Sequence, residues 1–244
     1  MVWLIVAIAS LVGGLGSVQI IAAALALGVP LAWLRSMLAL AVGTLLSIAF
    51  LGLIPESLTV LDAETALAVV LAAMLGFFVL EKVLIIHHCH GQECDAHNAA
   101  PVLVLVGDAF HNAIDGVAIG AAFVVSLPLG LATALAVALH EIPQEVGDYA
   151  VLLEGGFDVR RAVFWNSASS LTTLPMALLA YWTLSVAEAA VPYLLVVGAG
   201  AFIYVALADL VPMLHRRGSR TQGAMQIALV LLGVALIWLV ETAL

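Results

Sequence analysis

Apolar residues fill eight long stretches of the chain, and polar residues lie mainly in the connections between them. Each stretch reaches the roughly 20 residues that an α-helix needs to cross a bilayer. None shows the strict apolar–polar alternation of a membrane β-barrel strand. The pattern predicts an all-α polytopic membrane protein, with one transmembrane domain over residues 1–244. The predicted spans cover about 2–28, 31–56, 65–86, 101–125, 129–153, 161–184, 189–212 and 223–243.

The composition favours the same class of protein. Hydrophobic residues make up 65% of the chain and charged residues 9%, whereas a soluble domain is about half apolar and about a quarter charged. With only seven Lys and Arg residues, the chain lacks the basic surface that nucleic-acid binding requires. The lipid bilayer is therefore an expected partner, and nucleic acid is not.

The basic residues predict how the spans are oriented. With eight spans, all seven of them fall on one side, and the other side carries only acidic residues. The positive-inside rule places the basic side in the cytoplasm of a plasma (inner) membrane, so that both termini lie outside. The acidic outer side either attracts cations or is an ordinary solvated rim. The basic set is Arg35, Lys82, Arg160, Arg161, Arg216, Arg217 and Arg220, and the acidic set is Asp62, Glu64, Glu188 and Glu241.

Two consecutive spans carry ionisable side chains, which are costly inside a membrane and usually mark function. Their positions recur at intervals of three, four or seven, which places them along one face of each helix. The short connection at 126–128 predicts that the two helices pack antiparallel. We call these two faces the polar stripes. The first consists of Asp108, His111, Asn112 and Asp115, and the second of His140, Glu141, Gln144, Glu145 and Asp148.

The chemistry of the two stripes points to a bound cation. Neither span contains Lys or Arg to pair with the carboxylates, so a divalent cation is the missing charge. Imidazole combined with carboxylate and amide oxygens suits Zn²⁺, Fe²⁺ and Mn²⁺, whereas oxygen ligands alone favour Mg²⁺ or Ca²⁺. The alternative is a buried hydrogen-bond network that holds the two helices together.

The stripes alone leave three other functions open. A metal exporter and a membrane metal sensor would need the same ligands. An intramembrane zinc protease is a more remote alternative, because His140 and Glu141 begin like the His-Glu-x-x-His motif. Gln144 stands where that motif has its second His.

The longest polar connection, 87–98, holds four of the seven His residues and both Cys residues. Such a dense set of ligands predicts loose metal contact on the cytoplasmic side. The alternative is a flexible loop without an ordered site. Its histidines are His87, His88, His90 and His97.

Two motifs in order carry a resemblance to a known family. His111-Asn112-Ala113-Ile114-Asp115-Gly116 followed by His140-Glu141-Ile142-Pro143-Gln144-Glu145 resembles the paired signature of the ZIP (Zrt/Irt-like) metal transporters, in the short form of bacterial members. The stretches Ile54-Pro55-Glu56 and 204–209 are similar too.

The resemblance implies an importer that moves Zn²⁺, and also Fe²⁺, Mn²⁺ or Cd²⁺, into the cytoplasm. It implies a 3+2+3 bundle with an inverted repeat and a metal site between spans 4 and 5. In such a bundle Glu56 and Asp209 either help at the entrance or close the site, or are satisfied polar residues near a membrane boundary. No enzymatic activity and no prosthetic group are expected, and a homodimer stays open. The implied ligands are His111, Asn112, Asp115, His140, Glu141 and Gln144.

The chain departs from the family pattern in two places. Gln144 stands where a Glu or His often bridges two metals, and a neutral amide is a poorer bridge. The stretch 169–175 has no carboxylate where some members add one. Both departures weaken the expectation of a tight second metal.

Overall fold

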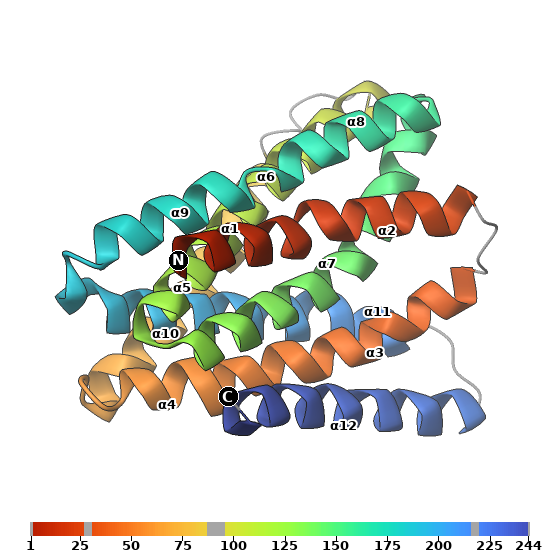
Figure 1. Ribbon diagram of the computed structural model, residues 1–244. Coiled ribbons are helices and arrows are strands. Elements are labelled where there is room, and N and C mark those ends of the chain that lie inside the picture. Colours follow the sequence, from red (N-terminus) through yellow and green to blue (C-terminus); the bar gives the residue numbers. More distant parts are fainter. Residues whose placement is uncertain (1, 27–30, 87–95, 216–219, 244) are drawn as a thin grey trace.

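Every element of the described chain is a helix (Figure 1). The computed structural model describes residues 2–26, 31–86, 96–215 and 220–243. The elements are α1 (Val2–Gly13), α2 (Leu15–Ala26), α3 (Leu31–Ser47), the π-helix η1 (Ile48–Leu53), α4 (Ile54–Ser57), α5 (Ala63–Ile86), α6 (Ala96–Val125), α7 (Leu127–Glu154), α8 (Val159–Ser170), α9 (Thr173–Leu184), the short 3₁₀-helix η2 (Glu188–Ala190), α10 (Val191–Tyr204), the π-helix η3 (Val205–Leu210), α11 (Val211–His215) and α12 (Arg220–Ala243).

The helices coincide with the eight predicted stretches, and the all-α class is confirmed. Within the described ranges, six helical segments are long and apolar enough to cross a membrane. The other two stretches are α7, whose polar stripe lowers its hydropathy, and α8–α9, which is interrupted between Ser170 and Thr173. The count of eight spans therefore stays a prediction. The helix α6 begins at Ala96, so position 97 belongs to this helix and not to the preceding loop.

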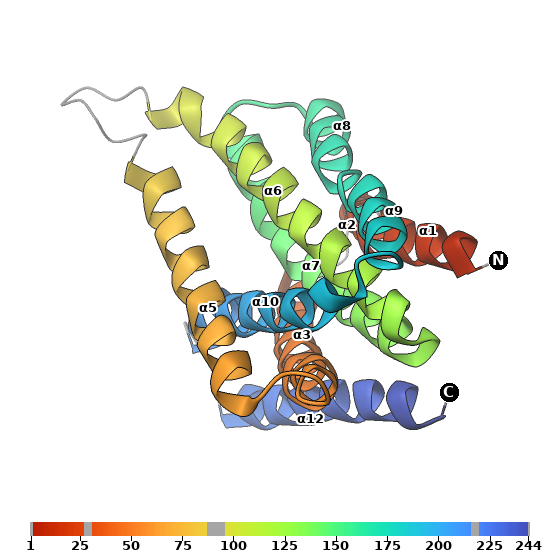
Figure 2. The ribbon, with the colours of Figure 1, turned by 90° about the vertical axis from the view of Figure 1, so that its left-hand side faces the viewer.

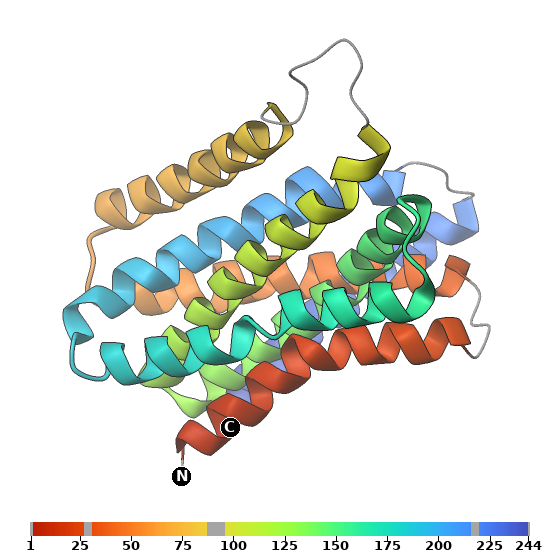
Figure 3. The same cartoon turned by 90° about the horizontal axis from the view of Figure 1, so that it is seen from above.

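The α6 and α7 pair lies in the middle of the bundle. The chain turns back at Ser126, whose hydroxyl caps α7 by accepting a hydrogen bond from the Leu129 amide (3.2 Å). The helix α6 packs against α9, α8 and α10, and α7 packs against α3, α2 and α1. Figure 2 shows α5 and α12 on the outside, and Figures 2 and 3 show both chain ends at one end of the bundle.

Apolar side chains cover much of the outside. On α5, Leu67, Leu71 and Leu75 recur every four residues and are all more than half exposed, at 57%, 57% and 54%. A stripe of this kind is unfavourable in water and suits contact with lipid chains. The interior contains, beside an apolar core, several carboxylates and both histidines of the two stripes, which are buried or partly buried. The distribution is that of a membrane protein.

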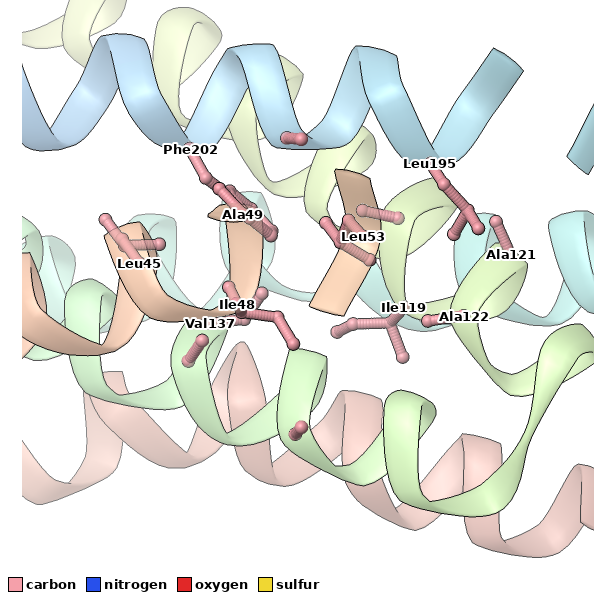
Figure 4. Packing of buried hydrophobic residues seen from close by; sticks show 14 of the residues in the cluster. Leu45, Ile48, Ala49, Leu53, Ile119, Ala121, Ala122, Val137, Leu195 and Phe202 are labelled. Atoms are coloured by element: carbon pink, nitrogen blue, oxygen red, sulfur yellow. The ribbon is translucent and has the colours of Figure 1, made fainter. Parts of the chain in front are cut away.

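The apolar core joins η1 and the end of α3 to the central pair (Figure 4). Leu45, Ile48 and Leu53 are fully buried and belong to one cluster with Ile119 of α6 and Phe202 of α10. Because lipid chains are as apolar as these side chains, the cluster is stabilised in a bilayer by close van der Waals packing and not by removal from water. The cluster fixes α6 and α7 against α3 and α10.

The turn after α7 brings α8 back along the central pair. The helix ends with Gly156 at φ 86°, and the Phe157 amide bonds the Leu152 carbonyl (3.0 Å). This is a Schellman end, which favours glycine because other residues are strained at positive φ. Asp158 then caps α8 by accepting from the Arg161 amide (2.8 Å). The reversal carries the polar residues of α8 to the stripe on α7.

Two glycines of α6 allow α9 to approach closely. A Cβ atom at Gly116 would overlap the Thr173 carbonyl oxygen, and one at Gly120 would overlap the Ala177 carbonyl oxygen. Gly147 on α7, by contrast, has nothing within 4 Å of the position of a Cβ. Close helix packing therefore explains the first two glycines and leaves Gly147 without a packing role.

Asp62, one of the acidic residues predicted on the outer side, has a structural partner. Its carboxylate accepts from the Thr65 amide (2.9 Å) and from the Thr65 hydroxyl (2.7 Å), just before α5. These hydrogen bonds, the amide first, hold the pKa of Asp62 below its usual value. The side chain is thus a helix cap.

Candidate metal centre

Two histidines and two carboxylates from the central helices converge on one point. His111 and Asp115 come from α6, and His140 and Glu141 come from α7. One ligand atom from each lies within 4.8 Å of all the others. We call this group the histidine–carboxylate centre. The spacing of four residues on α6 and the adjacent pair on α7 place all four side chains on the facing sides of the two helices.

The distances within the centre suit a shared cation. Nε2 of His140 lies 3.2 Å from Asp115 Oδ2 and 3.5 Å from Glu141 Oε1. Nε2 of His111 lies 3.5 Å from Asp115 Oδ2 and 3.8 Å from Glu141 Oε1. Four ligand atoms bound to Zn²⁺ at 2.0–2.2 Å in a tetrahedron lie about 3.3–3.6 Å from one another, and the separations in this centre are close to that range.

The backbone of α7 sets the orientation of His140. Its Nδ1 lies 3.1 Å from the Ala136 carbonyl oxygen. A carbonyl only accepts, so Nδ1 carries the hydrogen and donates it. In the neutral ring, Nε2 then keeps its lone pair, which is the form that binds a metal. The ring therefore presents its ligand atom to the centre.

The carboxylates of the centre lack hydrogen-bond partners. Asp115 and Glu141 are fully buried, and none of their four oxygens accepts a hydrogen bond from the described residues. Neither α6 nor α7 contains Lys or Arg. Buried carboxylates without partners are strongly unfavourable, so the arrangement calls for a cation. The donor set of two imidazoles and two carboxylates fits a transition metal.

A second group of carboxylates lies beside the first and shares one residue with it. Asp108 of α6, together with Glu141 and Glu145 of α7, also offers ligand atoms that all lie within 4.8 Å of one another. We call this group the carboxylate cluster. Glu145 accepts a hydrogen bond from Asn166 and another from the Ser170 hydroxyl (2.8 Å), both on α8.

Asn112 and Gln144 lie next to the centre, but their amides are engaged elsewhere. The Asn112 amide nitrogen donates to Asp108 Oδ1 (2.9 Å), and its oxygen accepts from the Thr173 hydroxyl (2.7 Å). The Gln144 amide nitrogen also donates to Asp108 Oδ1 (3.3 Å). In the structure both residues thus hydrogen-bond to Asp108, and their role as metal ligands stays a prediction.

The remaining predicted residues belong to neither group or lie outside the described residues. In α7, the Oδ2 atom of Asp148 is buried without a hydrogen-bond partner among the described residues, and Asp148 belongs to neither group. Glu56, in α4, is half-buried and also belongs to neither. The side chains of His97 and Asp209 are outside the described residues, as are the loop residues His87, His88 and His90.

Sequence reasoning missed the contribution of α8 and α9. Asn166, Ser170 and Thr173 are buried and hydrogen-bond the polar residues of the central pair. The available signal was the spacing of Asn166 and Ser170, which lie four residues apart in an otherwise predicted membrane helix. Their significance depends on the packing of α8 against α7, which spacing does not give.

The fold and the centre together define a class: a helical membrane protein with two histidines and two carboxylates, a set that could hold a metal ion, gathered between two central helices. A family model described as "ZIP Zinc transporter" matches residues 85–241. The chain belongs to this family. The matched range contains α6, α7 and most of the second half of the bundle.

Named relatives are similar over about half of the chain. The zinc transporter ZIP4 of Homo sapiens is 46% identical over 121 residues, which are 49% of this chain and 18% of the relative. Zinc transporter ZIP6 of Homo sapiens is 43% identical over 118 residues, which are 48% of this chain and 16% of the relative. Zinc transporter ZIP10 of Homo sapiens is 40% identical over 121 residues, which are 49% of this chain and 15% of the relative. The matched part thus spans less than a fifth of each relative.

Proposed function

We propose that the protein imports divalent transition-metal ions, zinc first among them, through the histidine–carboxylate centre. The bundle crosses the membrane eight times in the 3+2+3 arrangement, with both termini outside. In this arrangement α6 and α7 are the middle pair, and the helices before and after them form the two repeats. Family membership and relatives that are named zinc transporters support the choice of zinc.

One observation carries the proposal. Four buried oxygens of Asp115 and Glu141 have no hydrogen-bond partner among the described residues, and they lie around two imidazoles in the interior of an apolar bundle. A permanent structural network would satisfy these oxygens with donors, as the neighbouring Glu145 is satisfied by α8. Oxygens left without donors are suited to a positively charged cargo.

The geometry also suggests how the cargo passes. An ion that reaches the centre exchanges its water ligands for imidazole nitrogen and carboxylate oxygen atoms. Release then requires the ligands to separate, and ligands from two different helices separate when one helix shifts against the other. Movement of the central pair against the flanking helices exposes the site to each side in turn, as in other carriers with inverted repeats.

The first test is metal uptake by sealed liposomes that contain the purified full chain. Zn²⁺, Cd²⁺, Mn²⁺ and Fe²⁺ are compared in the parent protein, in His111→Ala and in Glu141→Gln. The exposed Glu188→Gln serves as a control with the same change of charge. We expect saturable flux that is lost in the first two variants and kept in the control. Binding without flux would indicate a sensor, and flux unchanged in all variants would place the pathway elsewhere.

To assign the direction of transport, the orientation of the protein in the vesicle membrane must be known. Both cysteines of the chain lie within 87–98, which is predicted to be cytoplasmic. A membrane-impermeant thiol reagent therefore reports which side this loop faces. Import predicts flux toward the compartment that contains the loop. Flux only away from that compartment would make the protein an exporter.

A further inference from the structure

The two faces of α8 differ in chemistry. On the inward face, Asn166 and Ser170 are buried and hydrogen-bond Glu145. The outward face carries two exposed arginines, followed one turn later by two aromatic residues that are 63% and 45% exposed. The spacing of i, i+1, i+4 and i+5 places these four side chains along one stripe of the helix. We call this stripe the α8 surface, and it consists of Arg160, Arg161, Phe164 and Trp165.

The two arginines have no acidic partner in the described part of the chain. None of the ion pairs found there includes Arg160 or Arg161. The carboxylate of Asp158, at the same turn, caps the helix by accepting from the Arg161 amide (2.8 Å). The end of the helix is thus already capped, so an anion at this surface would be bound by the two guanidinium groups and not by the helix terminus.

The guanidinium group of Arg161 is held in place by an aromatic ring. Its central carbon lies over the ring of Phe157, 4.1 Å from the ring centre, which is a cation–π contact. This contact uses the flat face of the guanidinium, whereas its N–H donors lie at the edge, in the plane of the group. The edge therefore stays available for two parallel hydrogen bonds to a phosphate group, the geometry in which arginine binds phosphate best.

The aromatic pair indicates how deep the arginines lie in the membrane. The rings of Phe164 and Trp165 are in edge-to-face contact, with centroids 5.3 Å apart. Tryptophan is enriched at the level where lipid headgroups meet acyl chains. Arg160 precedes Trp165 by five residues, or about 7.5 Å along the helix. Figures 1 and 3 show that α8 begins at the end of the bundle away from both chain ends, so the arginines lie on the headgroup side of the tryptophan.

We propose that the α8 surface binds the phosphate group of an anionic phospholipid in the cytoplasmic leaflet, with Phe164 and Trp165 packed against its acyl chains. The two arginines without acidic partners favour a lipid of net negative charge over a zwitterionic one, and the cytoplasmic leaflet contains such lipids. The exposed aromatic residues beside the arginines favour a lipid over a soluble anion. The inference rests on the proposed function only in the orientation of the bundle in the membrane.

Quenching of Trp165 fluorescence by brominated lipids tests the proposal. The four other tryptophans of the full chain are replaced by Phe. The protein is placed in mixed vesicles in which either the phosphatidylglycerol or the phosphatidylcholine carries brominated acyl chains. Both leaflets have the same composition, so the orientation of the protein does not affect the result. We expect phosphatidylglycerol to be preferred beside Trp165 by roughly 5–30-fold, because each arginine near the lipid surface contributes about a factor of five.

Two arginine variants and a second reporter locate the preference. The Arg160→Gln/Arg161→Gln double variant should quench equally with both lipids. Arg160→Gln alone keeps the contact of Arg161 with Phe157, and it should lower the preference several-fold if the double variant does not fold. A chain that retains only Trp182, which is 56% exposed on α9, is the matched control. It should show no preference, because α9 carries no basic residue.

Three results would overturn the proposal. The first is equal quenching of Trp165 by the two lipids, and the second is a preference that persists in the arginine variants. The third is a preference of the same size at Trp182, which would not be local to α8. Inorganic phosphate, added at constant ionic strength, should leave the preference unchanged, whereas its loss would show that the surface binds free phosphate instead of lipid. None of these readouts involves a metal, so their failure leaves the proposed metal import intact, and absence of zinc flux leaves the lipid result intact.

Discussion

Nε2 of His111 lies 3.0 Å from Nε2 of His140, and the two rings stand at 90° to each other. The residues are 29 positions apart and come from different central helices. Because His140 donates from Nδ1 to the Ala136 carbonyl, the two rings present the same kind of atom to one point. A hydrogen bond between them uses one Nε2 as donor, whereas a metal ion uses both as ligands.

Removal of either imidazole should therefore impair metal binding severely. His111→Ala or His140→Ala deletes a ligand, and we expect Zn²⁺ affinity to fall by more than the roughly 10–100-fold that follows loss of a partner behind a ligand. Competition with a fluorescent zinc chelator measures the change in the purified protein. Glu188→Gln should bind like the parent. Parent-like affinity in both histidine variants would contradict the placement of the centre.

Thr173 is expected to hold the Asn112 amide in its observed orientation. Thr173→Val keeps the shape but leaves the buried Asn112 oxygen without its donor. An unsatisfied buried acceptor costs about 1–3 kcal/mol, so thermal unfolding in detergent should occur at a lower temperature. Thr173→Ser keeps the hydroxyl and should unfold close to the parent. Equal melting of the Val and Ser variants would show that the hydrogen bond is unimportant.

The glycines of α6 and α7 should respond differently to alanine. At Gly116 and Gly120 a methyl group meets the backbone of α9, and overpacking of this kind costs about 1–3 kcal/mol. At Gly147 the space is open, and the higher helix propensity of Ala favours the variant by up to about 1 kcal/mol. Melting temperatures of the three variants, compared in one detergent, check the order. If Gly147→Ala melted at as low a temperature as Gly116→Ala, the open space at Gly147 would be contradicted.

The His-rich loop should modulate transport and not be essential for it. Position 98 and His111 are 13 residues apart on α6, which is about 20 Å along a helix. Deletion of 87–98 therefore removes none of the centre, and we expect reduced but measurable Zn²⁺ uptake in liposomes. A matched chain with a Gly/Ser loop of equal length controls for the shortened connection. Complete loss of uptake in a folded deletion would make the loop part of the pathway.

The sequence allowed the helical class and the polar face of each central helix to be predicted, because both follow from periodicity alone. It placed His111 and Asp115 on one face of α6, and His140 and Glu141 on α7. It did not tell which polar residues of a face would bind to one another. Asn112 and Gln144 share their faces with the centre, yet both donate to Asp108.

The interruptions of the helices differ in how far the sequence indicates them. The π-helix η1 lies inside a uniformly apolar stretch, whereas the break between α8 and α9 falls in a run of Ser and Thr residues just before Pro175. At the break, the Thr172 hydroxyl donates to the Ala109 carbonyl of α6 (2.9 Å). This contact is set by a neighbouring helix 63 residues away in the chain, so no local periodicity predicts it.

Glu141→Gln should raise the stability of the metal-free protein while it impairs metal binding. Glu141 is fully buried, both its oxygens lack partners, and it belongs to both carboxylate-containing groups. Gln has nearly the same shape and carries no charge, so the substitution relieves repulsion with Asp108, Asp115 and Glu145. We therefore expect the metal-free variant to melt at a higher temperature than the metal-free parent, as active-site charges are commonly kept at the expense of stability.

Added Zn²⁺ should reverse that order. In the parent, an ion at a hundredfold excess over its dissociation constant stabilises the fold by about 2.7 kcal/mol, because it binds the folded centre and interacts with the buried, unpartnered oxygens of its carboxylates. The Glu141→Gln protein lacks the charge that attracts the ion and should show little or no zinc-dependent shift. Differential scanning fluorimetry, with and without chelator, measures all four melting temperatures. A metal-free variant that is less stable than the parent would mean that Glu141 already has a stabilising partner in the folded protein, and a parent-like zinc shift in the variant would remove Glu141 from the ligand set.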